Sequence, residues 1–304
     1  MGWYVVVRLT SPWNAVKLVT LSAAHSQNLP VAEQELRVGI YNIAHGRGGQ
    51  LNAKNWEGGD RAAKIERMKL IGRMLKEAQV DIVVLNEVDF SSFWSGHFDQ
   101  AQVIAQEAGF FYLAEQRNVD IAIPLCRLRF GNAILSKYPI SDVKFITFPN
   151  ASKFAELFGG DTKYGLLCTL NLSENRRVRV FAVHLTTYSE DLRVKCARII
   201  LDNLRESDIS LIVMGDFNST PTGYPNFHVD KSGDNAIDLL SASGVLTTLP
   251  MRTSPNPEDF TFPSEKPVRV IDWIFVSSPW KIVEKNVLSS ELSDHLPVIA
   301  RLSH

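Results

Sequence analysis

The sequence predicts a mixed α+β fold, in which two mixed β-sheets pack together and are flanked by helices. Strand-like segments such as residues 81–87 and 211–215 are apolar on both faces, so other layers must cover both sides of each sheet. Segments with one apolar helical face lie between the strands and can supply these layers. Hairpin-like pairs, such as 166–172 with 178–183, interrupt a regular strand–helix alternation. This interruption favours a sandwich over a doubly wound parallel sheet.

In the first half, apolar runs predict strands and 3.6-residue periodicity predicts helices. The expected order is strand 36–42, a helix after Asp60, strand 81–87, helix 100–107 and strand 131–136. Asp60 is a good helix N-cap, and the apolar positions that follow it are Ile65, Met68, Ile71, Leu75 and Ala78. Gly109 is expected to end the second helix, and the Tyr138–Pro139 turn ends the strand that follows.

The second half continues with strands, two helices and a final pair of strands. The expected order is strands near 165–171 and 177–183, a helix after Ser189, strand 211–215, helix 235–243, and strands 268–276 and 296–302. Ser189 is followed by acidic residues in the first turn, which favours a helix start. The apolar face of that helix comprises Leu192, Cys196, Ile199 and Ile200, with Asn203 on the same face. Gly244 is expected to end the shorter helix.

Composition sets loose limits on function. The chain has 304 residues, of which 45% are hydrophobic and 21% charged, so it can bury a large core and is not expected to be disordered. A net charge of -1 gives no overall basic signature for nucleic acid, although a local basic patch would still be compatible with it. The three cysteines, Cys126, Cys168 and Cys196, are too few and too scattered for a disulfide framework or a zinc site.

The N-terminal segment is expected to lie outside the folded domain. We predict an N-terminal extension over residues 1–34, either disordered or signal-like, and one domain over residues 35–304. Residues 15–24 end in small residues as a signal peptide does, but Lys17 within the apolar stretch counts against one. No stretch approaches the ~18–20 apolar residues of a membrane span. We therefore expect a cytoplasmic monomer, with export through an atypical N-terminal signal as the alternative.

Polar residues stand where the apolar strands end. Asn42, Glu87 and His184 each close a strand, Asp216 and Asn218 follow the strand at 211–215, and Asp294 with His295 precedes the last strand. Carboxylate and amide oxygens suit Mg²⁺, and imidazoles suit proton transfer. Such a set at strand ends is what a metal-dependent phosphoesterase requires.

The motifs in this order resemble those of the endonuclease/exonuclease/phosphatase superfamily, which includes deoxyribonuclease-like and neutral sphingomyelinase-like enzymes. The similar segments are Tyr41-Asn42, Leu85-Asn86-Glu87-Val88-Asp89, Gly131–Ser136, Val183-His184-Leu185, Gly215-Asp216-Phe217-Asn218, Arg269–Ile274 and Ser293–Val298. They span most of the chain, and the Gly-Asp-Phe-Asn and Ser-Asp-His-x-Pro motifs are highly specific. The resemblance implies a four-layer α/β/β/α sandwich, in agreement with the strand pattern.

The resemblance also implies a metal site. Glu87 is the best metal ligand, because a carboxylate at the end of a buried strand is costly unless it is paired or bound to a cation. Asn42 resembles a second ligand, or an amide that orients one, and Asp294 approaches the metal. Mg²⁺ is the expected ion, with Mn²⁺ as the alternative. Zinc is not expected, because no cluster of His and Cys has suitable spacing.

The remaining site residues resemble catalytic groups. Asp216 would orient or deprotonate the attacking water, and Asn218, two residues further, would hold a phosphoryl oxygen or the attacking group. Asp272 would orient His295 over the phosphate. His184 resembles the leaving-group acid of deoxyribonuclease-like and sphingomyelinase-like members, and Asn132 resembles a phosphate-facing amide. The candidate partners of His184 are Glu115 and Asp120. His45 follows Asn42 closely and is a candidate to line the site, but it matches no catalytic motif and is treated as a loop residue by default.

We therefore expect a Mg²⁺-dependent phosphoesterase that hydrolyses a phosphomonoester or phosphodiester by in-line attack of water. A nuclease acting on DNA or RNA is the alternative within enzymes, and a catalytically silent binding scaffold is the alternative outside them. Nucleic acid is not the favoured partner, because the arginines near the predicted loops (Arg47, Arg117, Arg127 and Arg129) form no basic stripe in the sequence. Loops 46–60, 90–94 and 224–228 are the expected substrate-recognition elements.

Overall fold

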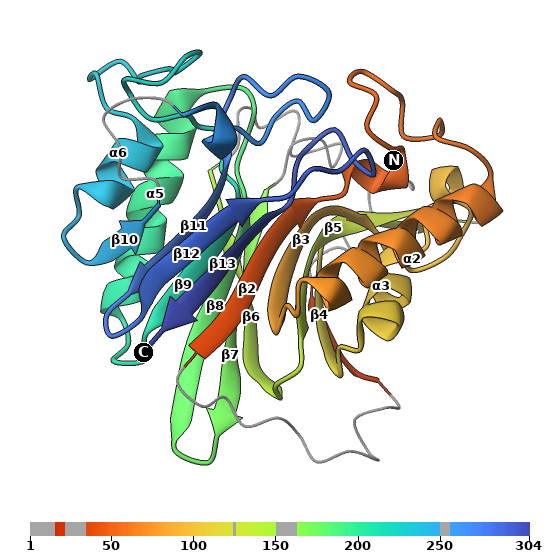
Figure 1. Cartoon of the computed structure of the whole chain (residues 1–304), viewed down its shortest axis with the longest axis horizontal. Helices are drawn as coiled ribbons and strands as arrows, with labels where there is room; N and C mark the ends of the chain where they lie inside the picture. The colour runs from red at the N-terminus through yellow and green to blue at the C-terminus, as the bar shows by residue number, and fades with distance from the viewer. Residues whose placement is uncertain (1–15, 22–34, 124–125, 150–162, 250–255) are drawn as a thin grey trace.

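The computed structural model describes residues 16–21, 35–123, 126–149, 163–249 and 256–304. The described residues form two mixed β-sheets packed face to face, with helices on both outer faces (Figure 1). This arrangement confirms the predicted sandwich of two mixed sheets flanked by helices. Among the described residues, no helix is both long and apolar enough to cross a membrane.

The first sheet has seven strands, and its centre is built around a parallel pair. In spatial order they are β1 (Val16–Thr20), β4 (Tyr112–Ile123), β5 (Cys126–Ser136), β3 (Ile82–Asp89), β2 (Glu35–Asn42), β13 (Val298–Ser303) and β12 (Lys281–Val287). β2 and β3 run parallel, while their other neighbours pair antiparallel. The long helix α2 (Arg61–Glu77) and the shorter α3 (Gln100–Ala108) cover the outer face.

The second sheet has six strands and repeats this plan. The order is β10 (Leu246–Thr248), β11 (Asp272–Ser277), β9 (Leu211–Asp216), β8 (Arg176–His184), β7 (Tyr164–Ser173) and β6 (Ile140–Thr147). β8 and β9 are parallel, and the predicted hairpin of β7 with β8 is confirmed. Helices α5 (Glu190–Arg205) and α6 (Ala236–Ser241) lie on its outer face. Three short 3-10 helices, η2 (Ala44–Gly46), η3 (Phe93–Ser95) and η4 (Pro257–Asp259), lie in the connections.

The core lies in three layers, as the two-faced apolar strands predicted. Between the sheets pack the inward side chains of both, including Val38, Val84, Val180 and Met214. Separate apolar clusters lie beneath α2 and α3 and beneath α5 and α6. Asp60 accepts a hydrogen bond from the backbone N–H of Ala63, which confirms the predicted N-cap of α2. Cys168 and Cys196 are free and buried, while the side chain of Cys126 lies outside the described residues.

Several expected boundaries were wrong. The strand expected over residues 268–276 begins only at Asp272, and the last strand begins at Val298 rather than 296. The edge strand β12 comes between these two strands in the sequence and was not predicted. Residues Val16–Thr20, which were assigned to the N-terminal extension, form β1 and pair antiparallel with β4. Most of the remaining extension lies outside the described residues.

Gly215 allows β8 and β9 to pair beside the Asp216 carboxylate. A Cβ at residue 215 would lie 1.8 Å from the Val183 carbonyl oxygen, and the two residues are direct partners in the β8–β9 pairing. We expect Gly215→Ala to lower the free energy of unfolding by about 3 kcal/mol, because backbone atoms must separate to relieve the overlap. Urea denaturation followed by circular dichroism would measure this.

Gly109→Ala is the matched control. A Cβ there meets no atom within 4 Å, but φ is +82°, so only the backbone conformation disfavours a side chain. That effect alone costs about 1 kcal/mol. Equal losses in the two variants would contradict the steric role assigned to Gly215.

Candidate active site

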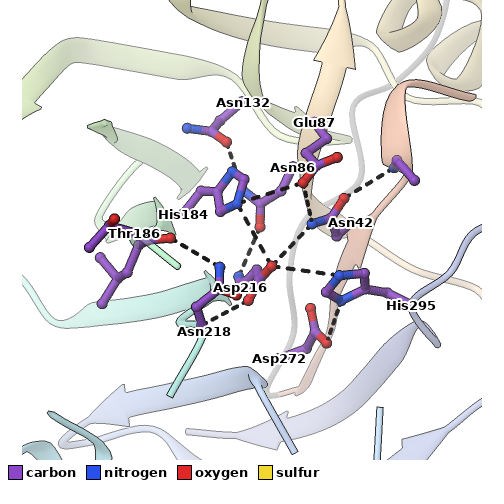
Figure 2. Close-up of polar contacts among 12 residues, drawn as sticks. Asn42, Asn86, Glu87, Asn132, His184, Thr186, Asp216, Asn218, Asp272 and His295 are labelled. Atoms are coloured by element: carbon purple, nitrogen blue, oxygen red, sulfur yellow. Dashed lines mark hydrogen bonds and ion pairs between the residues drawn. The ribbon is translucent and has the colours of Figure 1, made fainter. Parts of the chain in front are cut away.

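The predicted site residues meet at one end of the sandwich, where parallel strands of both sheets finish. In the register of the sheets, Asn42 pairs with Asn86 at the end of β2 and β3, and His184 pairs with Asp216 at the end of β8 and β9. Asp272 begins β11 and pairs with Asp216 from the other side. The carboxyl ends of two parallel pairs therefore deliver polar side chains to one place between the sheets (Figure 2).

Asp216 lies at the centre of this group. Its Oδ2 atom accepts a hydrogen bond of 3.1 Å from the Asn42 amide, and it lies 3.7 Å from Nε2 of both His184 and His295. Its Oδ1 atom accepts the backbone N–H of Asn218 at 2.8 Å. Burial raises the pKa of Asp216 most strongly, and although His295 opposes this, the pKa reaches about 7. A carboxyl group with such a pKa can exchange a proton near neutral pH.

His295 and Asp272 form the pair that was predicted from sequence. Nδ1 of His295 lies 2.9 Å from the carboxylate of Asp272, which also accepts a 2.6 Å hydrogen bond from the Thr261 hydroxyl. Burial alone would lower the pKa of His295, but the carboxylates of Asp272 and Asp216 outweigh it and raise the pKa to about 10. The imidazole is therefore a cation at neutral pH, fixed in orientation beside Asp216.

The Glu87 carboxylate has space around it. The residue has a positive φ of 53°, at an irregularity in the β3–β5 pairing, which turns its side chain toward the site. Its contacts are Asn42 Nδ2 at 3.3 Å, His45 Nε2 and Arg47 Nη1 at 3.5 Å, and His184 Nε2 at 3.9 Å. All exceed the about 2.7–2.9 Å of a charge-assisted hydrogen bond. Burial raises the pKa of Glu87, but His45, His184 and Arg47 together hold it well below its usual range.

Arg47 joins the two acids that were predicted to bind metal. Its guanidinium contacts Glu87 through Nη1 and hydrogen-bonds Asp294 through Nη2 at 2.5 Å. Asp294 is almost fully buried, and its Oδ1 lies 3.4 Å from the Ser293 hydroxyl. The Arg47 guanidinium thus compensates the negative charge of two carboxylates, one of which is buried. A second acidic group in the described residues comprises Asp216, Asp272 and His295, whose potential ligand atoms all lie within 4.8 Å of one another.

Sequence comparison decides the family. The model of the endonuclease/exonuclease/phosphatase family matches residues 39–295, which include every predicted site residue. The chain belongs to the endonuclease/exonuclease/phosphatase family. Members of this family are generally hydrolytic phosphoesterases and typically depend on a divalent metal. A search of curated protein sequences found no significant match.

Solved structures show the same fold. A protein of this family from Beutenbergia cavernae is 22% identical with a TM-score of 0.65, covering 89% of this chain and 72% of that one. The human Nocturnin catalytic domain with bound sulfate is 20% identical with a TM-score of 0.60, covering 96% and 98%. The Bacteroides thetaiotaomicron mannosyl-6-phosphatase is 17% identical with a TM-score of 0.59, covering 88% and 100%. These similarities establish the fold of this family member, and the named activities belong to those proteins.

His184 has different partners from those suggested by the sequence. Glu115 and Asp120 instead form ion pairs with basic residues, namely Lys17, Arg117 and Arg129. The acids near His184 Nε2 are Glu87 and Asp216. Burial and the positive charge of Lys163 hold the pKa of His184 well below its usual value. A nearby negative charge, such as a bound phosphate, would favour the protonated form of this imidazole.

Asn132 is fully buried and lies in a chain of amide hydrogen bonds. Its Oδ1 accepts from Asn86 at 2.8 Å, and its Nδ2 donates to Gln116 at 2.7 Å and to the Tyr164 carbonyl at 3.2 Å. Asn86 in turn accepts the backbone N–H of Asp216 at 2.9 Å. Both ends of the Asn132 amide are thus engaged within the protein, and the substrate-binding role expected for it stays a prediction. The amide chain fixes the backbone of Asp216.

His45 was missed as a site residue. Its Nδ1 lies 2.9 Å from Asp89 and its Nε2 lies 3.5 Å from Glu87, and only 6% of the residue is exposed. Two signals in the sequence could have identified it. His45 follows Asn42 by three residues and precedes a glycine, and Asp89 follows Glu87 by two. Both signals can be read from the sequence, but only the fold brings the segment with His45 next to the segment with Glu87 and Asp89.

The contacts of Arg47 lead to a test of its structural role. Removing it with Arg47→Met leaves the half-buried Glu87 and the buried Asp294 without their shared cation. Without divalent ions we expect the free energy of unfolding to fall by about 3 kcal/mol, the scale for breaking a buried ion pair. Added Mg²⁺ should restore most of this loss by taking the place of the cation. Thermal unfolding with EDTA and with Mg²⁺ measures both effects.

Arg73→Met is the matched control, because Arg73 pairs with Glu66 and Glu107 on an exposed surface. We expect little change in stability relative to the wild type there, and the same small change with EDTA and with Mg²⁺. Identical behaviour of the Arg47 and Arg73 variants would contradict the role given to Arg47.

Proposed function

We propose that this chain is a divalent-metal-dependent phosphoesterase, which hydrolyses a phosphate ester by in-line attack of water. The observation that carries the proposal is the position of the Asp216 carboxylate, 3.7 Å from two imidazoles and adjacent to Glu87 through their shared partner Asn42. Attack of water on a phosphate ester requires a base, a cation that stabilises the phosphate and a metal site close together. Asp216, His295 and Glu87 would supply these groups.

The donor set fits Mg²⁺ or Mn²⁺. Glu87 and Asp294 offer carboxylate oxygen atoms, whereas Asn42 donates from its amide nitrogen to Glu87 while its Oδ1 accepts the backbone N–H of Ala44, which suits an amide that orients the ligand. The long contacts around Glu87 leave its carboxylate free to accept a shorter bond from a cation. In that role the metal would polarise the phosphate and lower the pKa of a water molecule. Arg47 would then lose its ion pair with one of the acids and could contact the negatively charged substrate.

The protein groups would divide the remaining work. Asp216, with its raised pKa, would orient the attacking water and take its proton. His295, held as a cation by Asp272, would stabilise negative charge on the phosphoryl oxygens. Asn218, whose amide donates to the Leu185 carbonyl at 3.0 Å, would place its second amide hydrogen on the phosphate. His184 would protonate the leaving group once the phosphate has raised its pKa.

The charges near the site do not favour duplex nucleic acid. Arg117 and Arg129 are paired with Asp120, and Arg47 is paired with acids of the site, so these arginines offer little net positive charge to a phosphate backbone. Exposed aromatic residues lie on the connecting segments instead, among them Trp56, Phe93, Tyr188 and Phe227. Aromatic side chains can stack on a sugar, a base or a lipid headgroup. We therefore favour a small or single-stranded phosphate ester as substrate.

A silent scaffold is not favoured. Such a protein would have no need to bury Asp216, Asp272, His184 and His295 together, because unpaired charges in a protein interior are destabilising. Natural proteins keep costly arrangements of this kind mainly at functional sites.

Metal removal tests the proposal directly. We expect hydrolysis of bis-p-nitrophenyl phosphate to require Mg²⁺ or Mn²⁺ and to stop in EDTA, because the donors are hard oxygen atoms. The same assay across plasmid DNA, RNA, sphingomyelin and sugar or inositol phosphates would identify the substrate class. Efficient nicking of plasmid DNA would promote the nuclease alternative, and undiminished activity in excess EDTA would overturn the proposed site.

The His295–Asp272 pair can be tested by substitution. His295→Ala should lower kcat by about 100-fold or more, the scale of charge-stabilising and acid–base contributions. Asp272→Asn should lower kcat as well, because a neutral amide cannot hold the imidazole as a cation. Steady-state kinetics with circular dichroism to check folding provides the measurement. Wild-type turnover in both folded variants would show that this pair has no catalytic part.

A further inference from the structure

A buried cluster centred on His45 lies beside Glu87 and has no part in the mechanism above. The imidazole is 6% exposed and lies edge-on to the rings of Trp94 and Phe130, at centroid distances of 5.7 and 5.1 Å. Nε2 of this imidazole approaches the carboxylate of Glu87 at 3.5 Å instead of lying wholly among the apolar rings. The orientation of the ring therefore calls for a separate explanation.

Hydrogen bonds fix the orientation of this ring. Nδ1 of His45 lies 2.9 Å from Asp89, whose other carboxylate oxygen accepts the Trp94 indole N–H at 2.7 Å. Gln100 closes the cluster, because it donates to the His45 carbonyl at 2.8 Å and accepts the backbone N–H of Asp89 at 2.9 Å. A carboxylate bonded to one imidazole nitrogen is the usual support of a histidine that binds metal through the other nitrogen.

The backbone at this point is strained. Ala44 and His45 both have positive φ values, 48° and 52°, although neither is glycine. Each such residue costs of order 1–3 kcal/mol, and such conformations persist where the surrounding structure enforces them, often at functional sites. Here the strain turns His45 back toward β3, where Asp89 and Glu87 lie two residues apart.

The remaining nitrogen atom faces the metal site. Within the described part of the chain, Nε2 of His45 makes no hydrogen bond, and the acid it approaches is Glu87, whose Oε2 lies 3.5 Å away. This separation exceeds the about 2.7–3.2 Å of an N–H···O hydrogen bond. It equals the separation expected for two ligand atoms of one metal ion. Two such atoms lie about 3.0–3.5 Å apart when each is about 2.1 Å from the ion.

We propose that Nε2 of His45 is a ligand of the divalent ion that binds Glu87, so that the metal site combines nitrogen and oxygen donors. The proposal rests on the metal dependence proposed above and deepens it. Mg²⁺ strongly prefers oxygen ligands, whereas an imidazole ligand favours the transition metals. The site should therefore bind Mn²⁺ more tightly than Mg²⁺, with His45 responsible for the preference.

Electron spin-echo envelope modulation of bound Mn²⁺ is the direct test, because it detects the ¹⁴N nucleus of a coordinated imidazole without any turnover. The full-length protein with substoichiometric Mn²⁺ should show this modulation. His45→Gln should lose it and should bind Mn²⁺ at least about tenfold more weakly by calorimetry, while its affinity for Mg²⁺ changes much less. His184→Gln is the matched control, since His184 Nε2 also approaches Glu87, at 3.9 Å, and the modulation should persist there.

Asp89→Asn provides a second variant in which the imidazole is retained. It should keep the ¹⁴N modulation but bind Mn²⁺ more weakly, because the ligand loses its charged support, and it carries the test if His45→Gln does not fold. Mn²⁺ binding without ¹⁴N modulation in the wild type would overturn the proposal and leave the metal-dependent function standing. Modulation that disappears in His184→Gln rather than His45→Gln would also overturn it. Failure to bind any Mn²⁺ would reject both the ligand and the metal-dependent function.

Discussion

The structure of the site depends on how one buried carboxylate is held between two sheets. Asp216 ends a strand of the second sheet, yet its side chain accepts a hydrogen bond from Asn42 and its backbone N–H donates to Asn86, both in the first sheet. These bonds cross the sandwich at the point where the apolar core stops. An unpaired carboxylate at such a depth would be strongly destabilising, so the two amides both stabilise Asp216 and fix the relative position of the sheets.

A second constraint is the balance of charge around that carboxylate. Glu87, Asp272 and Asp294 add negative charge in the same region, and each has a basic partner: His295 pairs with Asp272, and Arg47 is shared by the other two. The described site therefore holds its acids close together without leaving one unpaired. A divalent ion would compete with Arg47 for the same oxygen atoms, so metal binding and release of this arginine would be coupled.

The sequence predicted the fold well where side-chain patterns are local. The helix caps at Asp60 and the polar residues at strand ends were found because each needs only its neighbours along the chain. β4 was missed because its buried residues include Glu115, Gln116 and Asp120, whose partners come from other strands and other parts of β4. β12 was missed because it is an exposed edge strand with charged residues and only partly buried apolar ones. In both strands, tertiary pairing replaces the apolar alternation that identifies a strand in sequence.

The same distinction separates the site residues that were found from those that were not. Asp216, His295 and Asp272 lie in motifs that carry their own signal, whereas the position of Asn132 within an amide chain and the contacts of His45 exist only after folding. His45 shows why. Its motif and that of Glu87 are far apart in sequence, and a strained turn after β2 brings them together beside the irregularity in β3. A parallel pairing of β2 with β3 places both motifs at one edge, so the ligand proposed at His45 depends on strand order rather than on any local pattern.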